Sequence, residues 1–181
     1  MIAFVLGSGS ALLLIHYPPV KSGVKNGAWT TNFNVGSSDA GMYLRAVIAR
    51  IGLFALNKTE TIYYKADCDD EGQRLCSSCD YRIEGKEIDT RWWSITLYGE
   101  DHFLIANEHN RYAYNMKNLA REPDGTYKIF ISMSEKKGNW LPSGKEDQLL
   151  SLTLRCYNPK PMLYEQPENI ELPRIIKVRC K

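Results

Sequence analysis

The sequence predicts a mainly β domain, an antiparallel β-sandwich of jelly-roll type with one amphipathic helix near its N-terminus. Three observations support this prediction. Short strand-like runs recur along the chain, turn residues separate them, and no regular alternation of strands with helices is present. Eleven tyrosines and four tryptophans, found mainly in the strand-like runs, also favour a β-rich protein.

The first element is an uncharged apolar segment, Ile2–Ile15. Its length is typical of the apolar part of a signal peptide and is short of the roughly 20 residues of a membrane-spanning helix. Three interpretations stay open: an uncleaved signal anchor, which we prefer, a cleaved signal and a buried segment. Against an anchor, the nearest basic residues, Lys21 and Lys25, follow the segment instead of preceding it. The expected division is an anchor or signal at 1–17, a tether at 18–26 and one β domain at 27–181.

One amphipathic helix is expected next, over Asp39–Leu56. Ser37, Ser38 and Asp39 offer capping side chains at its start. The helix is expected to cover one face or one opening of the sheets. Its apolar residues follow at helical spacing: Leu44, Val47, Ile48, Ile51, Phe54 and Ala55.

Strand patterns recur at short spacing after this helix. The stretch Arg91–Asn107 predicts two strands joined by a turn at Gly99–Asp101. In the first strand the residues alternate between two different faces, with Trp93, Ile95 and Leu97 on one of them. The predicted strands are Thr61–Ala66, Asp80–Glu84, Trp92–Tyr98, His102–Ala106, Arg111–Tyr114, Tyr127–Met133, Leu149–Tyr157 and Ile175–Val178, and a helical turn is expected near Met162–Glu165.

Length and charge restrict the class of protein. The 181 residues suit one domain with a core of its own. The net charge is +2 and the charges are interspersed, so the sequence has no basic patch of the kind that binds nucleic acid. No motif implies a cofactor.

The five cysteines differ in their surroundings. Cys156 alternates with leucines and is interpreted as a small buried side chain. Cys68, Cys76 and Cys79 lie in a hydrophilic segment, and the last two have the spacing of a zinc knuckle. No second pair of ligands completes a zinc site, although His102 or His109 could contribute. A redox Cys-x-x-Cys site is disfavoured because the strand–helix–strand context of thioredoxin-like proteins is absent.

Polar and aromatic side chains gather at strand ends and in adjoining loops, where binding sites are common. Arginine can hold a carboxylate or phosphate, and tyrosine or tryptophan can stack on a sugar or planar ligand. The alternative interpretation is a structural network that braces turns. Trp92 and Trp93 are both interpreted as core residues and not as a platform for a ligand. The candidate ligand-binding residues are Tyr98, Asp101, Asn107, Arg111, Asn139, Trp140, Arg155 and Tyr157.

Catalytic patterns are weak. No Gly-x-Ser-x-Gly motif is present, and neither His102 nor His109 has a partner that spacing can name. A hydrolase or isomerase with a pocket around Asp101, Arg111 and Arg155 is the alternative to a binding protein.

Several short motifs occur in an order that resembles the bacterial "domain of unknown function 1214" family, and the resemblance covers about residues 26–181. The chain looks like the short, single-domain form with a membrane-targeting segment. The motifs are WTTN at Trp29–Asn32, IYY at Ile62–Tyr64, CDYRIEG at Cys79–Gly85, RWWSITLYGEDHFLIAN at Arg91–Asn107, NRY at Asn110–Tyr112, DGTY at Asp124–Tyr127, GNWLPSG at Gly138–Gly144, LRCYNP at Leu154–Pro159 and LPRI at Leu172–Ile175.

The resemblance implies a jelly-roll β-sandwich in the cell envelope and no particular reaction. It also implies a Cys79–Cys180 disulfide, because short relatives carry cysteine at both positions, and leaves Cys68 and Cys76 as a possible second pair. Relatives carry leucine where Cys156 stands, which agrees with a buried free thiol.

These observations together predict an exported envelope domain that binds a small molecule or glycan or serves as an accessory module. Its N-terminal segment would hold it in the bacterial inner membrane facing the periplasm, or it would be free in the periplasm. A structural envelope protein is the remaining alternative.

Overall fold

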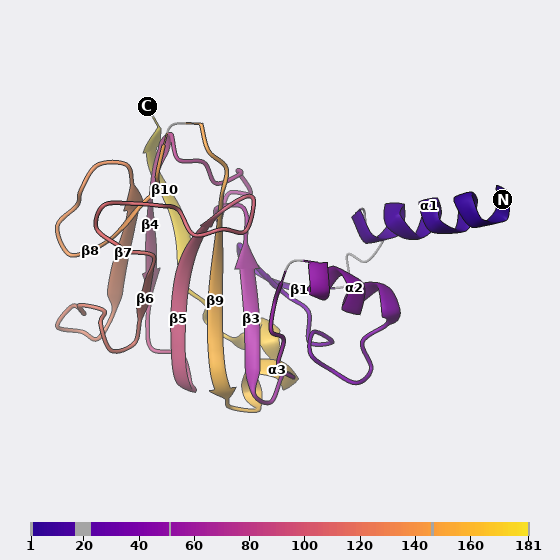
Figure 1. Ribbon diagram of the computed structural model, residues 1–181. Helices are drawn as coiled ribbons and strands as arrows, with labels where there is room; N and C mark the ends of the chain where they lie inside the picture. The colour runs from indigo at the N-terminus through magenta and orange to yellow at the C-terminus, as the bar shows by residue number, and fades with distance from the viewer. Residues whose placement is uncertain (1, 17–22, 51, 146, 181) are drawn as a thin grey trace.

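The protein is mainly β, as predicted, with its strands in two sheets and three α-helices outside them. The computed structural model describes residues 2–16, 23–50, 52–145 and 147–180. Figure 1 shows the two sheets side by side and the N-terminal helix projecting away from them. The elements are α1 (Ile2–His16), β1 (Val24–Asn26), β2 (Trp29–Thr31), α2 (Met42–Arg50), β3 (Thr61–Ala66), β4 (Cys79–Gly85), β5 (Thr90–Gly99), β6 (Ala113–Asn115), β7 (Tyr127–Ser132), β8 (Asn139–Pro142), β9 (Leu150–Pro159), α3 (Met162–Glu165), a 3₁₀ turn (Pro167–Asn169) and β10 (Arg174–Cys180).

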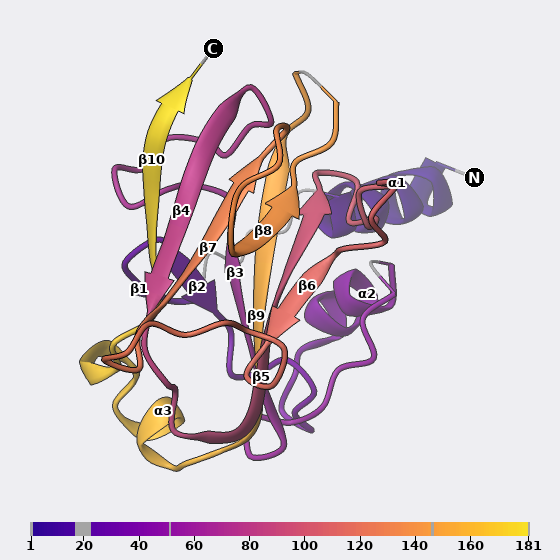
Figure 2. The same cartoon turned by 90° about the vertical axis from the view of Figure 1, so that its left-hand side faces the viewer.

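The larger sheet has the order β1-β2-β3-β9-β5-β6, and the smaller sheet has the order β10-β4-β7-β8. Figure 2, turned by 90°, shows the smaller sheet in front of the larger one. Neighbouring strands are antiparallel except β7 and β8, which pair in parallel, so the expected all-antiparallel arrangement is not complete. The jelly-roll topology stays a prediction.

Both sheets contribute to one hydrophobic core. Trp93 of β5 stacks on Tyr127 of β7, with ring centroids 5.2 Å apart, and both side chains are fully buried. Ile83 and Ile129 come from the smaller sheet and Leu152 from the larger one, and all three are fully buried. Burial of this apolar area from both sides holds the sheets together.

The predicted strands β3, β4, β5, β7, β9 and β10 are confirmed within one or two residues, and the helical turn at Met162–Glu165 is α3. The predicted strand His102–Ala106 is wrong. His102 has φ of +67°, which the extended conformation does not allow, and Phe103 after it is 73% exposed. One isolated bridge between Tyr98 and Leu104 is all that remains of the predicted hairpin.

The predicted helix at Asp39–Leu56 is shorter in the structure. Helix α2 ends at Arg50, and Gly52, just after it, has φ of +68°, a left-handed conformation typical of helix ends. Phe54, expected on the apolar stripe, therefore lies outside the helix and is 87% exposed. Ile51 lies outside the described residues.

The N-terminal segments differ in part from the expected division. Helix α1 covers most of the segment interpreted as an anchor, and large apolar side chains such as Phe4 and Leu13 are exposed on it. Within the described part of the chain, no helix is both long enough and apolar enough to cross a membrane. Residues 18–22 of the expected tether lie outside the described residues, and its last residues form β1, which pairs with β2.

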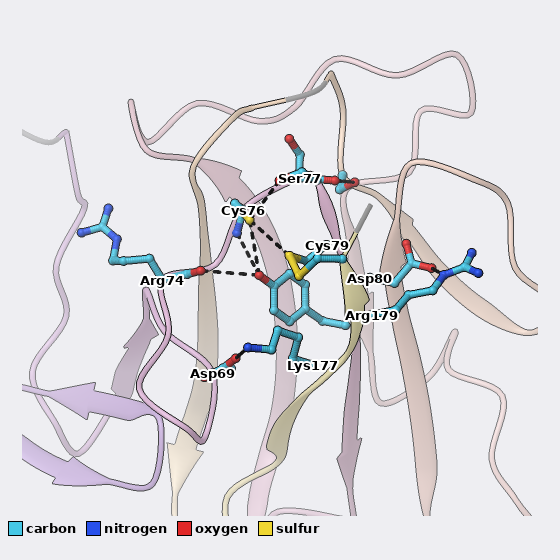
Figure 3. Close-up of a disulfide and its surroundings, with 12 residues drawn as sticks. Asp69, Arg74, Cys76, Ser77, Cys79, Asp80, Lys177 and Arg179 are labelled. Carbon is cyan, nitrogen blue, oxygen red and sulfur yellow. Dashed lines mark hydrogen bonds and ion pairs between the residues drawn. A yellow bond between two sulfur atoms is a disulfide. The ribbon is translucent and has the colours of Figure 1, made fainter.

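A disulfide joins the first residue of β4 to the end of the last strand. Cys180 is opposite Cys79 in the register of β10 and β4, and the two sulfur atoms are bonded, as the resemblance implies. Figure 3 shows this disulfide beside an ion pair between Asp80 and Arg179, which are neighbours of the two cysteines. The disulfide closes a loop across a sequence separation of 101 residues.

The possible second pair, Cys68 with Cys76, is not formed, and both residues are free thiols. Cys68 is opposite Arg74 in an isolated antiparallel bridge, so Cys76 lies two residues further along the opposing segment. Diagonal neighbours of this kind have Cα atoms about 7–8 Å apart, beyond the usual reach of a disulfide. Cys156 is fully buried as predicted, and burial raises the pKa of its thiol well above the ordinary range.

We predict that Cys180→Ser lowers the free energy of unfolding by about 2–5 kcal/mol, because the unfolded chain regains the freedom of a loop of about a hundred residues. Urea unfolding without reductant measures this change. Cys68→Ser is the control and should change stability by less than about 0.5 kcal/mol. Equal stability of the Cys180→Ser variant and the unchanged protein would contradict the structural role of the disulfide.

The ion pairs of Asp80 predict a dependence on pH. Burial alone would raise the pKa of this carboxyl, but hydrogen bonds from Lys136 and Arg179, at 2.9 and 3.0 Å, hold its pKa below the ordinary value. A lowered pKa stabilises the fold above the unfolded-state pKa, and the contribution is lost as the pH falls through the folded-state value. Asp80→Asn should therefore cost about 1 kcal/mol at pH 7, and this cost should shrink as the pH is lowered from about 4 toward 2. A constant difference across this range, measured by urea unfolding, would refute the assignment.

Candidate functional site

The outer face of the larger sheet carries the candidate site. In β9, the residues Leu152, Leu154 and Cys156 face the core, so Thr153 and Arg155 between them face outward. The neighbouring strands add outward-facing residues in register. Tyr63 of β3 is opposite Arg155 on one side, Ser94 of β5 is opposite it on the other, and Tyr98 of β5 is opposite Ser151.

Arg155 is held by uncharged partners. One terminal nitrogen of its guanidinium donates to the Tyr98 hydroxyl at 2.8 Å, and the other donates to the Thr96 hydroxyl at 3.2 Å. The guanidinium also lies 5.6 Å from the centre of the Tyr98 ring. Among the residues with described positions, no carboxylate pairs with Arg155. The cation is therefore fixed in direction but not neutralised.

Helix α2 and the segment after it lie over this face and border a half-open cavity of about 450 Å³. Figure 1 shows α2 beside β3, on the side of the larger sheet away from the smaller one. Tyr63 helps to hold the covering segment, because its hydroxyl donates to the Phe54 carbonyl at 3.2 Å and accepts the Leu56 N–H at 3.4 Å. The lining residues are Val47, Arg50, Gly52, Leu53, Tyr63, Lys65, Tyr98, His102, Ser151, Thr153 and Arg155.

The cavity combines positive charge with apolar walls. Arg50, Lys65 and Arg155 come from three different elements, and none of the described lining residues is acidic. Lys65 contacts Asp67 at 3.3 Å, but both side chains are 43% exposed and the pair is weakly held. Val47 and Leu53 supply aliphatic surface from the covering segment. This arrangement is suited to an anionic group attached to an apolar body.

A second cavity of about 260 Å³ adjoins the first and shares Lys65, His102 and Ser151 with it. Its lining is more highly charged and includes Arg74 and Glu100, which form an ion pair at 2.9 Å. His102 lies between the two cavities because the turn after β5 places it there.

Of the eight predicted ligand-binding residues, two line the larger cavity of about 450 Å³. These are Tyr98 and Arg155. Tyr157 lies further along the same face, with its ring 5.3 Å from that of Trp92. Trp92 is therefore half-buried on the outer face and not in the core, in contrast to Trp93. Asp101 accepts the Phe103 N–H at 3.0 Å and so closes the turn after β5.

Four other predicted residues form a structural cluster at the edge between β6 and β8. Asn107 accepts the Arg111 N–H at 3.1 Å and donates to the Arg111 carbonyl at 3.0 Å, which fixes the loop between β5 and β6. The Arg111 guanidinium then lies 5.7 Å from the ring centre of the buried Trp140. The Asn139 side-chain amide bonds only backbone groups. Its nitrogen donates to the carbonyls of Ala120 and Lys128, and its oxygen accepts the Ala120 N–H. The pocket expected around Asp101, Arg111 and Arg155 is therefore not formed.

The candidate zinc ligands do not form a metal site. Cys79 is bonded to Cys180, so it has no thiolate to offer, and the His109 ring packs edge-on against Trp140 at 5.1 Å. Within the described ranges, no group of three or more histidine, cysteine or acidic side chains is arranged to hold a metal ion.

Sequence reasoning did not select Arg50, Tyr63, Lys65 or Thr153 as site residues. Tyr63 and Lys65 alternate with buried residues of β3, so the sequence pattern alone could have predicted that they face outward. Their position beside Arg155 depends on the pairing of β3 with β9, which brings together residues 92 positions apart in sequence. No local pattern encodes such a pairing.

Comparison with known proteins agrees with the fold. A solved structure, the VPA0106 protein from Vibrio parahaemolyticus, is 25% identical with a TM-score of 0.66, and the alignment covers 96% of this chain and 43% of that one. This chain thus spans less than half the length of the Vibrio protein. An uncharacterised protein from Burkholderia cenocepacia is 18% identical, with a TM-score of 0.43 and coverage of 67% and 30%. No curated protein matches the sequence.

The model of a family described as "Protein of unknown function (DUF1214)" matches residues 60–161. The match contains β3, β5 and β9, which form the floor of the cavity, whereas α2 and β10 lie outside it. Because this match covers more than half of the sequence, the chain belongs to the DUF1214 family.

Proposed function

We propose that the protein is a binding module for a small organic anion with an apolar body. The observation that carries this proposal is Arg155, whose guanidinium is aimed by two hydroxyl groups and has no carboxylate partner among the described residues. An arginine in this state can donate two further hydrogen bonds to a carboxylate or a phosphate group. Its partners stay in place when the ligand leaves, so the site is formed in advance.

The rest of the cavity specifies the other part of the ligand. A volume of about 450 Å³ lies in the range of sites for small molecules. Val47 and Leu53 supply aliphatic groups on the side of the cavity opposite the strands. The Tyr63 and Tyr98 rings add apolar surface from the strands themselves. An alkyl chain or a ring attached to the anionic group would displace water from these walls, which favours binding. A glycan without charge would leave the guanidinium without an anion.

We also propose that the protein is exported and acts in the cell envelope, in the bacterial inner membrane or the periplasm, as a jelly-roll domain held at the membrane by α1. Two observations support this location. Disulfides such as Cys79–Cys180 persist mainly in oxidising compartments. Helix α1 carries no charged residue before His16, and its apolar side chains are exposed around it, which is typical of a segment that enters lipid.

One prediction from this proposal concerns Arg155→Gln, which removes the charge but keeps an amide that can bond Tyr98 or Thr96. The variant should bind octanoate or octyl phosphate about 10- to 100-fold more weakly, the loss expected for a hydrogen bond to a charged group. Isothermal titration calorimetry measures the change, and comparison of the two ligands shows whether carboxylate or phosphate is preferred. Octanol, which has the same chain without the charge, should bind much more weakly to the unchanged protein.

Arg111→Gln is the matched control, because Arg111 contacts Trp140 and does not line the cavity. It should bind the same ligands as tightly as the unchanged protein. Equal losses in the two variants, or binding of octanol as tight as that of octanoate, would disprove the proposed site.

A separate prediction concerns α1. The full chain should sediment with phosphatidylcholine vesicles, and the double variant Phe4→Lys/Leu13→Lys should remain in solution, because each lysine places a charge where the helix would enter lipid. Met42→Lys is the control: Met42 is 77% exposed but lies on α2. If the double variant sediments as fully as the unchanged protein, α1 is not the membrane-binding segment.

A further inference from the structure

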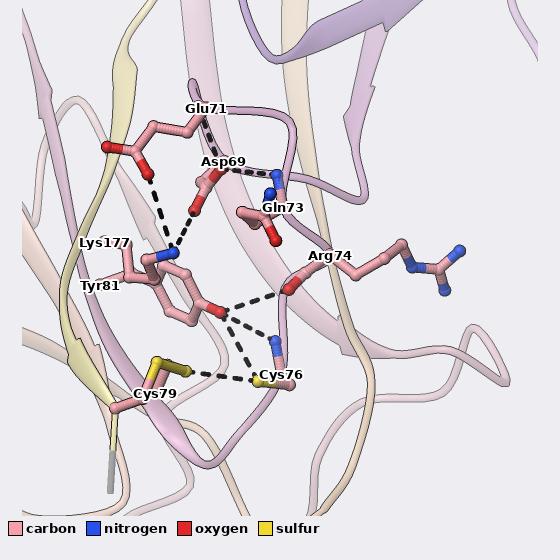
Figure 4. Close-up of polar contacts among 9 residues, drawn as sticks. Asp69, Glu71, Gln73, Arg74, Cys76, Cys79, Tyr81 and Lys177 are labelled. Carbon is pink, nitrogen blue, oxygen red and sulfur yellow. Dashed lines mark hydrogen bonds and ion pairs between the residues drawn. A yellow bond between two sulfur atoms is a disulfide. The ribbon is translucent and has the colours of Figure 1, made fainter.

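A third cysteine lies against the disulfide of the smaller sheet. The Sγ atom of Cys76 is 3.5 Å from the Sγ atom of Cys79, which is bonded to Cys180. Figure 4 shows the Cys76 side chain directed at the Cys79 end of the disulfide. Cys76 is half-buried, Cys79 is buried and Cys180 is exposed. A free thiol and a disulfide are therefore in contact, and the two ends of the disulfide differ in their access to solvent.

The backbone around Cys76 is firmly held. The Cys79 N–H donates to the Cys76 carbonyl at 3.3 Å, which closes a tight turn, and the Cys76 N–H donates to the Tyr81 hydroxyl at 3.0 Å. Ser77 in this turn is buried, its hydroxyl accepts the Gln148 N–H at 2.9 Å and its own N–H donates to the Gln148 carbonyl at 2.8 Å. The position of the Cys76 sulfur is thus a property of the fold and not of one flexible loop.

The surroundings of Cys76 favour its reactive form. Burial alone would raise the pKa of the thiol, but hydrogen bonds from the Ser78 and Tyr81 hydroxyls and from the backbone N–H groups of Ser78 and Cys79 outweigh this effect and lower the pKa. The two hydroxyl oxygens lie 3.3 and 3.7 Å from the sulfur. Thiolate is the species that attacks a disulfide, and exchange is fastest when its pKa is near the ambient pH.

We propose that Cys76, Cys79 and Cys180 form a thiol–disulfide exchange site. The Cys76 thiol loses its proton to solvent, and its sulfur attacks Cys79 Sγ. A Cys76–Cys79 bond forms, the Cys79–Cys180 bond breaks, and Cys180 leaves as a thiolate that takes a proton from solvent. One disulfide and one thiol are present before and after, so the step needs no oxidant or reductant.

The product is geometrically reasonable. Residues at the two ends of a closed turn have Cα atoms within about 7 Å, which overlaps the range that a disulfide spans. The leaving cysteine is at the end of β10, an edge strand, where it can move into solvent. Exchange would thus convert a half-buried thiol into an exposed one at the chain end and release the covalent tie between β10 and β4.

The charged groups around the site contact one another and not the sulfur atoms. Lys177 of β10 lies 4.0 Å from Asp69 and 3.7 Å from Glu71, next to the Tyr81 ring in Figure 4. On the other side of the disulfide, Asp80 is paired with Arg179 (Figure 3) and also with Lys136. The Arg74 side chain points away from the sulfur atoms toward Glu100. The pH dependence of exchange should therefore follow the titration of Cys76 itself.

The test uses disulfide mapping of the full chain. Protein kept at pH 4 is brought to pH 6, 7, 8 or 9, and excess N-ethylmaleimide is added at successive times. Trypsin cleaves after Arg74, Arg82 and Arg179, so Cys76 and Cys79 remain in one peptide and Cys180 is on another. We expect a peptide with an internal Cys76–Cys79 disulfide to accumulate together with labelled Cys180, and to do so faster at higher pH.

Three variants complete the test. Cys76→Ser should abolish labelling of Cys180, while Cys68→Ser, which removes another half-buried thiol, should leave it unchanged. Ser78→Ala should shift the pH profile of exchange to higher pH, because it removes a hydrogen bond that lowers the Cys76 pKa. Circular dichroism checks that each variant is folded. Complete labelling of Cys76 without any internal disulfide or labelled Cys180 at any pH would overturn the proposal, as would persistent labelling of Cys180 in Cys76→Ser.

Discussion

The pairing of β9 with β3 on one side and β5 on the other is the constraint on which the rest of the structure depends. These pairings run almost the full length of the central strand. They direct Leu152, Leu154 and Cys156 into the core, where the residues of the smaller sheet meet them. The same pairings direct Arg155 outward between Tyr63 and Ser94. Because strand residues alternate between the two faces, a slip of one residue in this register would bury the arginine and expose the leucines, so the core and the candidate site are fixed by one interaction.

The two sheets use their outer surfaces differently. The larger sheet is covered by α2 and the segment after it, and the space that remains between them is the cationic cavity. The smaller sheet ends in the β4–β10 edge, which is closed by a disulfide and by the ion pairs of Asp80. Four of the five cysteines occupy three different environments in this arrangement, and the fifth, Cys68, is a half-buried free thiol. Cys156 is buried among leucines and unreactive, Cys79 and Cys180 are bonded, and Cys76 is held by hydroxyl groups beside that bond.

Local sequence patterns predicted the parts of the fold that local physics controls. Strand-like runs between turn residues located β3, β4, β5, β7, β9 and β10, and alternation with leucines identified Cys156 as a core residue. The pattern failed at His102–Ala106, which is as apolar as a strand but begins with a residue in a left-handed conformation. The helix prediction extended too far because the apolar stripe continues past Gly52, where the backbone turns out of the helix.

The candidate site was less open to prediction, because it is made by contacts between distant strands. The sequence offered eight polar and aromatic candidates and no reason to prefer some of them over others. Of these eight, Tyr98 and Arg155 line the larger cavity. Asn107 and Asn139 bond backbone groups in loops, which asparagine does as readily as it binds ligands. The contact of Cys76 with the disulfide could not be predicted from a local pattern either, because it requires β10 to pair with β4.

The register of β9 directs Arg155 into the cavity, where we propose that it binds an anion. The most direct test is an NMR titration that follows the Nε–Hε resonances of the arginine side chains as octanoate is added to the full chain. The structure predicts that the Arg155 resonance moves with saturation, while that of Arg111, which contacts Trp140, stays in place. A shift of Arg111 with none at Arg155 would contradict the proposed site and would place binding at the edge between β6 and β8.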